Sequence, residues 1–185
     1  DCIGLHPDAA DVRCPYWGYR IGELHHQTRA RGKVFNLNSG VPAGAPAGVI
    51  DKVYIKATNA VGTVLDIKAQ TGVRINSLEV NDACCRAIYL ETSPNTSIGM
   101  LRFEKCTVDP GEDLFTVAGS IATLTIENLE FQYVDATGSD GCYGGACWGG
   151  AKLSITGAVT VRDCSGSAAA PFRAFRAQTD GSQYG

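Results

Sequence analysis

A nine-residue pattern that returns along the chain is the feature that most constrains its fold. The segments INSLEVNDA (75–83), IGMLRFEKC (98–106) and IENLEFQYV (126–134) place apolar residues at their first, fourth and sixth positions. IDKVYIKAT (50–58) has the same pattern, and ITGAVTVRDC (155–164) has it with one extra residue. The first positions, 50, 75, 98, 126 and 155, are 25, 23, 28 and 29 residues apart. Periods of 20–50 residues are typical of solenoids.

A second, shorter apolar element alternates with the first. Its copies are VFNL (34–37), VLDI (64–67), AIYL (87–90), LFTV (114–117) and FRAF (172–175). Both elements alternate with period 2 and are rich in Val, Ile, Thr and Phe, which favours strands over helices. Because equivalent strands of successive coils must stack their apolar side chains, we predict an all-β parallel β-helix of five to six coils. A β-sandwich is the alternative, but it does not require one template in five copies.

The chain ends differ from the repeat. Residues 1–32 do not fit it; YRIGELHHQTRARG (19–32) is expected to form a short helix, and Cys2 and Cys14 to close a small loop. We therefore predict an N-terminal cap over 1–32 and a β-helix domain over 33–185. The C-terminal segment FRAFRAQTDGSQYG (172–185) resembles one more coil element followed by a polar tail, which leaves the last coil open.

Composition excludes several classes of protein. The 185 residues are 44% hydrophobic and 19% charged, with a net charge of −3 and no basic stripe, so a nucleic-acid partner is not expected. No segment reaches the roughly 20 apolar residues of a membrane span. Eight cysteines without zinc-finger spacing, and the sequon at Asn95, indicate a disulfide-bonded secreted glycoprotein, and the absence of an initial Met suggests a removed signal peptide.

The coils resemble a known superfamily. VNDACCRAIYLE (80–91) and VDPGEDLFTV (108–117) resemble coils of the pectin-lyase-like right-handed β-helix proteins. FQYVDATGSDGCYGGACWGG (131–150) and VTVRDCSGSAAAPF (159–172) resemble the Gly-Gly-Ala coils of cell-surface β-helix proteins. The resemblance covers residues 33–178 and implies the fold. Since the superfamily contains lyases, glycosidases, adhesins and structural fibres, it does not choose a function.

The outward positions of the aligned coils argue against a catalytic groove. One outward column reads Tyr54, Glu79, Arg102, Glu130 and Thr160, and another reads Ala57, Asp82, Lys105, Tyr133 and Asp163. Charges of alternating sign stabilise neighbouring strands on a solvated sheet face. A calcium site instead gathers carboxylates.

An acid-rich loop is the best candidate for chemistry. It carries Asp109, Glu112 and Asp113, and we expect it to lie near Glu91 of the preceding coil. Arg86 and Lys105 are the nearest candidate bases. These six residues are the catalytic candidates if the protein is a pectate-lyase-type enzyme, which would use calcium; otherwise no cofactor and no metal site are expected, and neighbouring His25 and His26 cannot share a face.

The cysteine positions suggest a pairing. Cys106 occupies the column of Ala83, so either Cys84 or Cys85 lies beside it one coil away, and Cys85 is the predicted partner because it has the inward parity. Cys164 lies two coils from Cys106, which exceeds the reach of a disulfide, and is expected to pair with Cys142 or Cys147. Cys2 is expected to pair with Cys14.

Two aromatic residues are the predicted contacts with a glycan or protein partner. Tyr143 and Trp148 stand in the glycine-rich run DATGSDGCYGGACWGG (135–150), which is expected to form a disulfide-closed loop. Together these features lead us to expect an extracellular or cell-surface structural or adhesive protein that associates with itself, other extracellular proteins or glycans. The alternative is a polysaccharide lyase or hydrolase, or a carbohydrate-binding module.

Overall fold

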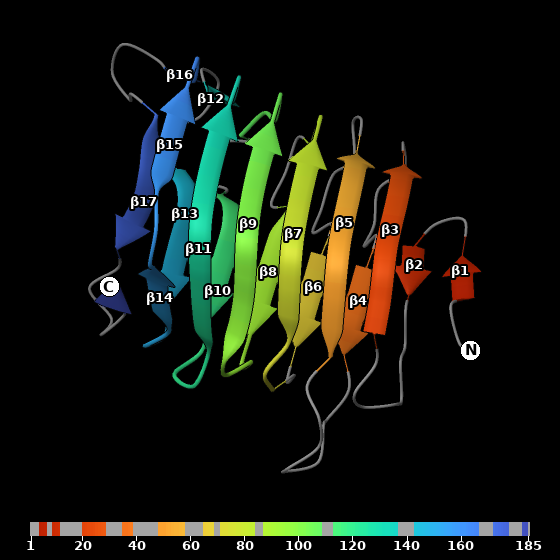
Figure 1. The fold of residues 1–185 in the computed structure, drawn as a ribbon. Helices are drawn as coiled ribbons and strands as arrows, with labels where there is room; N and C mark the ends of the chain where they lie inside the picture. The colour runs from red at the N-terminus through yellow and green to blue at the C-terminus, as the bar shows by residue number, and fades with distance from the viewer. Residues whose placement is uncertain are drawn as a thin grey trace.

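The chain folds as a stack of parallel strands (Figure 1). The computed structural model describes residues 4–6, 9–11, 20–28, 35–38, 48–57, 65–68, 71–83, 87–108, 113–136, 143–166, 172–177 and 183–184. Every regular element within these ranges is a β-strand. The molecule is therefore an all-β solenoid, as the repeat predicts.

Two parallel sheets form the solenoid, and the chain alternates between them. The long sheet contains β3 (Arg20–Thr28), β5 (Val49–Ala57), β7 (Arg74–Asn81), β9 (Thr96–Glu104), β11 (Thr123–Gln132), β14 (Lys152–Ile155), β15 (Val159–Arg162) and β18 (Gln183–Tyr184). The short sheet contains β4 (Phe35–Asn38), β6 (Leu65–Lys68), β8 (Ile88–Glu91), β10 (Asp113–Ala118), β13 (Tyr143–Trp148) and β17 (Arg173–Ala177). A third side is formed by β12 (Asp135–Ala136) and β16 (Ser165–Gly166). Each coil thus visits the long sheet first and the short sheet afterwards.

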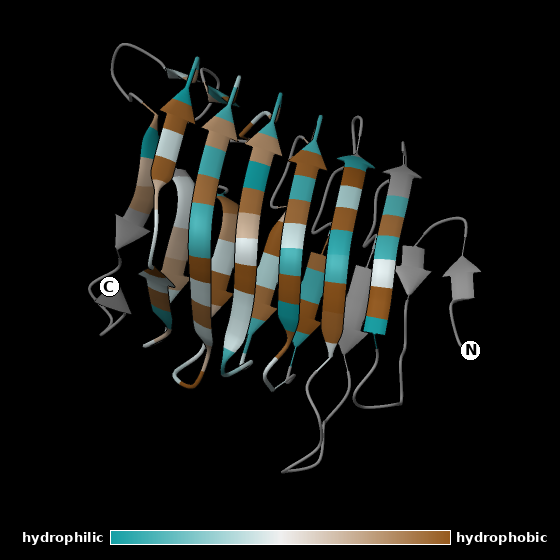
Figure 2. Cartoon of the chain, viewed as in Figure 1, coloured by the Kyte–Doolittle hydropathy of each residue, from teal (hydrophilic) through white to brown (hydrophobic). Residues whose placement is uncertain are grey.

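The apolar positions of the repeat form continuous columns inside the solenoid. Ile75 pairs with Ile98 and Ile98 with Ile126, so equivalent residues lie one above another. All nine predicted core residues of the three central coils are at most 1% exposed: Ile75, Leu78, Val80, Ile98, Leu101, Phe103, Ile126, Leu129 and Phe131. The brown and teal bands along the long strands show the same alternation (Figure 2). A slip by one residue would turn every one of these side chains outward.

The first coil begins earlier than the repeat indicates. The predicted helix within 19–32 is wrong, because Arg20–Thr28 is strand β3, in parallel register with β5. Ile21 pairs with Ile50 and Leu24 with Val53, so this segment has the apolar spacing of the template. Its polar His25 and His26 disguise the pattern. A short antiparallel hairpin, β1 (Gly4–His6) and β2 (Ala9–Asp11), lies at this end of the stack, with β2 beside β4.

The glycine-rich run contains a strand, where the sequence suggests a loop. Tyr143–Trp148 is β13, between β10 and β17 in the short sheet. An added Cβ on Gly145 would lie 2.2 Å from the ring of Phe115, and one on Gly144 would lie 2.3 Å from the ring of Phe131. The two glycines therefore make room for buried aromatic rings. Phe131 stacks in turn on Phe103, with ring centroids 5.5 Å apart.

The bend that follows each long strand has a left-handed backbone. Asp82, Lys105, Tyr133 and Asp163 occupy equivalent positions and have φ between 51° and 57°. The backbone N–H groups of Asp82, Lys105 and Tyr133 donate to carbonyl groups of the next coil, at 3.0–3.1 Å. The same bend is thus repeated and locked from coil to coil. Only the two aspartates are residues that readily adopt this conformation.

Candidate functional site

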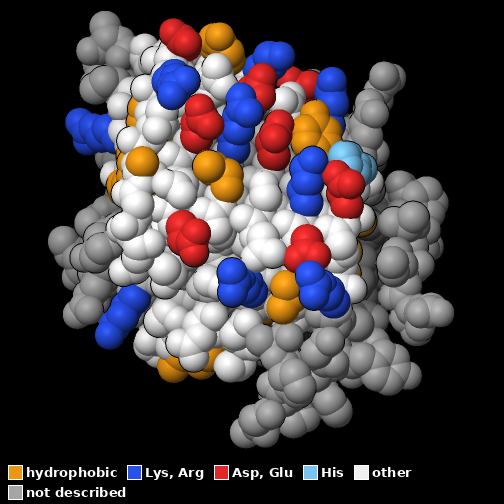
Figure 3. Space-filling model, in the orientation of Figure 1, with side chains coloured by type: hydrophobic (Ala, Val, Ile, Leu, Met, Phe, Trp, Pro, Cys, Tyr) orange, Lys and Arg blue, Asp and Glu red, His pale blue; other side chains and the backbone are white. Residues whose placement is uncertain are grey.

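The outer face of the long sheet carries charges of both signs. Glu79, Arg102 and Glu130 are consecutive partners in register, as the sequence predicts. The Arg102 guanidinium lies 3.7 Å from the Glu130 carboxylate and 3.1 Å from that of Glu104. Red and blue side chains alternate over this face (Figure 3). Ion pairs at such a surface contribute about 0–1 kcal/mol each, so they organise the face more than they stabilise it.

The second charged column differs from the prediction in its contacts. Asp82 and Lys105 are neighbours in register, but Asp82 pairs with Lys56 at 3.2 Å and Lys105 with Glu104 at 3.6 Å. Within the described residues, no group of three or more acidic, histidine or cysteine side chains could hold a metal ion. The two ion pairs each join charges of opposite sign, as on a solvated sheet face.

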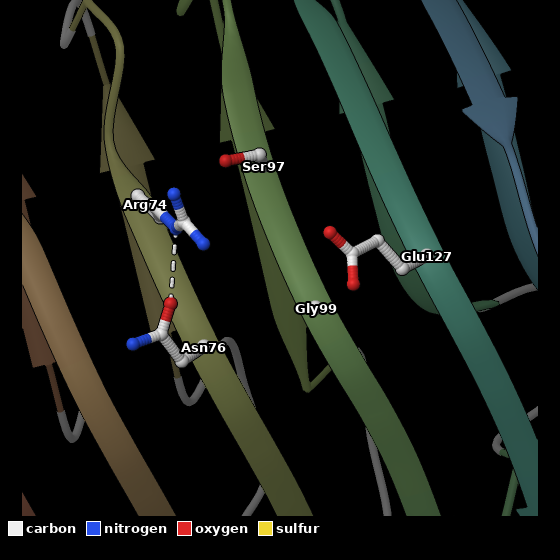
Figure 4. Close-up of a pocket in the computed structure, with 5 residues that line it drawn as sticks. All are labelled: Arg74, Asn76, Ser97, Gly99 and Glu127. Carbon is white, nitrogen blue, oxygen red and sulfur yellow. Dashed lines mark hydrogen bonds between the residues drawn. The ribbon is translucent and has the colours of Figure 1, made fainter.

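A polar hollow opens in this face above Gly99 (Figure 4). It has a volume of about 380 Å³ and is lined by Arg74, Asn76, Ser97, Gly99 and Glu127. Arg74 on β7 and Glu127 on β11 reach toward it from the strands on either side of β9 (Figure 4). Its size is that of a small ligand pocket, although its lining is polar where such pockets are mostly apolar.

Hydrogen bonds fix one wall of the hollow. The Arg74 Nε–H donates to Asn76 Oδ1 at 3.0 Å, and Asn76 Nδ2 donates to Asp51 Oδ1 at 2.9 Å. Asp51 also pairs with Arg20 at 3.2 Å. The network holds Asn76 and Arg74 in place across three coils.

The hollow can bind polar groups, but its lining lacks an acid–base pair. Glu127 is its one lining carboxylate, whereas hydrolysis of a glycosidic bond commonly uses two. Gly99 has a structural reason to be glycine, since an added Cβ would lie 2.6 Å from the carbonyl oxygen of Asn76. The sequence did not single out this hollow, because its residues look like ordinary outward strand positions.

Asp113, at the end of the acid-rich loop, does not lie near Glu91 as predicted. Glu91 is the register partner of Ala118, at the opposite end of β10 from Asp113. Five residues of strand, roughly 16 Å, separate these two positions. Asp113 is buried at the start of β10, while Lys105 is exposed at the left-handed bend that follows β9. Asp109, Glu112 and Arg86 lie outside the described residues, so their roles stay predictions.

Glu91 instead belongs to a polar group on the short sheet. It pairs with Lys68 of the preceding coil at 3.0 Å, and the Lys68 ammonium lies 5.3 Å from the centre of the Tyr89 ring. The hydrogen bond to Glu91 is the main reason that the pKa of Lys68 is raised, with nearby Asp66 contributing. This group joins neighbouring coils through charge and ring contacts.

The cysteine columns follow the predicted alignment. Cys106 aligns with Ala83 on one side and Val134 on the other, and Cys164 aligns with Val134. Cys164 is a thiol in this structure, so its predicted bridge to Cys142 or Cys147 is not formed in it. The predicted bridge from Cys106 to Cys85 is not tested, because Cys85 lies outside the described residues. Burial raises the pKa of the Cys164 thiol. Cys2, Cys14, Cys84, Cys85 and Cys142 lie outside the described residues, and the disulfide framework stays a prediction.

Among the Phe, Tyr and Trp side chains that the structure describes, Tyr133 is the most exposed, whereas the expectation for Tyr143 is not tested. Trp148 is half-buried in β13, and the side chain of Tyr143 lies outside the described residues. Tyr133 is 48% exposed at the left-handed bend after β11. Its place in an outward column could have identified it from the sequence. Asn95 of the sequon is exposed at a turn, where a glycan has room.

The last coil presents apolar residues to solvent. Val159 and Val161 pair in register with Leu129 and Phe131, which are at most 1% exposed, yet they are 43% and 48% exposed. Among the described strands, β15 pairs with β11 on one side only. Half of this coil is covered, because β18 pairs with β14.

In comparisons with known proteins, no family model, no curated protein and no solved structure matches the chain. The described residues include no helix long and apolar enough to cross a membrane.

Proposed function

We propose that this chain is an extracellular structural or adhesive protein that assembles end to end into a filament or surface array. The exposure of Val159 and Val161 at the open edge of β15 is the observation that carries the proposal. An unpaired strand edge is a template for another strand, and apolar side chains beside it add burial to the backbone hydrogen bonds. Secretion, disulfides and a glycan on Asn95 belong to the same proposal, as does membership of the pectin-lyase-like superfamily.

The first coil of a second copy is the proposed partner of this edge. β3 pairs with β5 and with no other described strand, and its Ile21 and Leu24 are only half-buried. In the register that relates successive coils within the chain, Leu24 of the second copy would continue the column of Val159. Such a head-to-tail contact repeats without closing unless its rotation allows a ring.

Static light scattering and negative-stain microscopy of the purified chain test this assembly. We expect species larger than the 19.5 kDa monomer, whose size grows with concentration. Val161→Lys places a charge in the proposed contact and should leave monomers. Thr160→Lys adds the same charge one residue away on the outer face and should still assemble. A wild-type chain that stays monomeric at high concentration would refute the proposal.

The alternative function is carbohydrate binding or cleavage, and the polar hollow above Gly99 favours binding. The hollow offers a cation, an amide, a hydroxyl and a single carboxylate, which suits recognition of hydroxyl groups better than bond cleavage. A calcium-dependent release of unsaturated uronides from mixed polyuronates would overturn the structural proposal in favour of a lyase. Without such release, cleavage of this kind is excluded and the hollow remains a candidate binding site.

A further inference from the structure

We propose that Tyr133 is a stacking platform for a neutral saccharide, on the outer side of the bend that follows β11, away from the polar hollow and one coil before the open edge of β15. The proposal does not depend on end-to-end assembly. It arises from a mismatch between the backbone at this position and the residue that occupies it.

The backbone of Tyr133 is left-handed, with φ of 53°. Gly, Asn and Asp adopt this conformation readily, whereas a bulky aromatic residue is strained in it. The bend itself is structural, because every described coil from β7 to β15 repeats it. The geometry of the bend therefore explains the φ value but does not explain the tyrosine.

Burial does not explain the tyrosine either. Tyr133 is 48% exposed, whereas Phe103, Phe115 and Phe131 are completely buried. Its backbone N–H donates to the carbonyl oxygen of Arg162 in the next coil at 3.1 Å. The ring is thus presented to solvent from a backbone that is held in place, so a ligand would have to order only the side chain.

The residues beside Tyr133 point to the chemistry of the ligand. Lys105 and Asp163 occupy the equivalent bend positions of the coils on either side, each about 4.8 Å away along the stack, and both are exposed. An ammonium group donates hydrogen bonds and a carboxylate accepts them, whereas a sugar hydroxyl can do both. A pyranose ring could stack its C–H face on the tyrosine ring and form hydrogen bonds from its hydroxyl groups to Lys105 and Asp163.

The opposite signs of the flanking charges select among ligands. Lys105 would attract the carboxylate of a uronate and Asp163 would repel it, so the two flanks give an acidic sugar no net electrostatic gain. Because a carboxylate also loses hydration on binding, a neutral sugar fits better than an acidic one. A protein partner would more commonly use a larger apolar patch, but the neighbours of Tyr133 in its column are charged. The site therefore suits a single neutral pyranose ring that carries hydroxyl groups around its edge.

Saturation-transfer NMR with soluble oligosaccharides tests the site. The probes are hexamers of β-1,4-glucose, β-1,4-xylose and β-1,4-mannose, with a galacturonic acid hexamer as the acidic contrast. We expect transfer to the ring C–H protons of at least one neutral hexamer and weaker transfer to the acidic one. Tyr133→Phe should retain binding, and Tyr133→Asn should weaken it about tenfold or more.

A matched variant separates binding from folding. Thr92→Asn introduces the same residue at another left-handed position, with φ of 48°, on a different bend. Both asparagine variants should melt at or above the temperature of the wild type, because Asn suits this backbone. Only Tyr133→Asn should lose the sugar. No transfer from the wild type to any neutral hexamer, or equal transfer in Tyr133→Asn, overturns the proposal. An effect of Tyr133→Asn on particle size without sugar binding also overturns it and indicates a protein contact.

Discussion

The central coils and the last coil use the same apolar pattern in the same register, but only the central coils bury it. Leu129 is 1% exposed and its partner Val159 is 43% exposed. Phe131 and Val161 differ in the same way. A solenoid coil cannot bury its inner face alone, since each coil is covered by its neighbours along the axis. The pattern therefore specifies which way a side chain points, while the position in the stack decides whether it leaves water.

The largest expected effect is the loss of stability when an inward apolar side chain is truncated in a central coil, compared with the same kind of truncation in the last coil. Leu101→Ala removes a side chain that is 0% exposed in a central coil and should lower the free energy of unfolding by about 2–5 kcal/mol. Val159→Ala removes fewer atoms from a half-exposed site and should cost less than about 1 kcal/mol. Urea denaturation of both variants measures the difference. Equal losses would mean that the last coil is buried in solution, as it would be within an assembly.

Two glycine substitutions compare how tightly an inner coil and the first coil are packed. Gly145→Ala places a Cβ 2.2 Å from the Phe115 ring and should destabilise the fold by about 1–3 kcal/mol. Gly22→Ala in β3 meets no atom within 4 Å and should be neutral or stabilising by up to about 1 kcal/mol. Thermal melting by circular dichroism compares them. A Gly145→Ala variant that melts with the wild type would show that the Phe115 ring moves aside at no cost.

The smallest expected effect is electrostatic and depends on pH. The pKa of Lys68 is raised above its usual 10.5 by its pairing with Glu91. Because the folded protein holds this proton more tightly than the unfolded chain, the stabilisation is complete below pH 10.5 and is lost as the pH rises through the folded pKa. Lys68→Met should therefore lower stability slightly at pH 8, by less than about 1 kcal/mol.

The control for this effect lies on the last coil. Arg162→Met removes an exposed cation there, and its effect should not change between pH 8 and 11, since arginine stays charged. Denaturation at the two pH values checks both variants. If Lys68→Met lowers the free energy of unfolding by as much at pH 11 as at pH 8, Lys68 contributes through packing on Tyr89 and not through its charge.

Much of the fold was predictable because its signal is local and repeated. The spacing of Ile75, Leu78 and Val80, returning at Ile98 and Ile126, was sufficient for the strand type, the register and the core. The signal failed where polar residues interrupt it. His25 and His26 concealed β3, and the glycines of β13 resembled a loop because their packing against Phe115 and Phe131 involves residues distant in sequence.

The candidate sites were less predictable, because each combines residues of several coils. The polar hollow joins Arg74, Ser97 and Glu127 from three strands, and it is also lined by Gly99. The expected approach of Glu91 to Asp113 was wrong, since membership of adjacent coils does not say at which end of a strand a residue lies.

The sequence by itself determined the solenoid, its inward columns and the alternation of charge on its outer face. Side chains of a strand alternate between its two faces, so the repeated spacing of apolar residues leaves one register in which all of them point inward. The tertiary structure alone decided how much of each column is buried, where a hollow opens and which aromatic ring is exposed. Those properties depend on what lies in the neighbouring coil, and at the last coil the pattern continues although the covering neighbour of β15 is absent from the described strands.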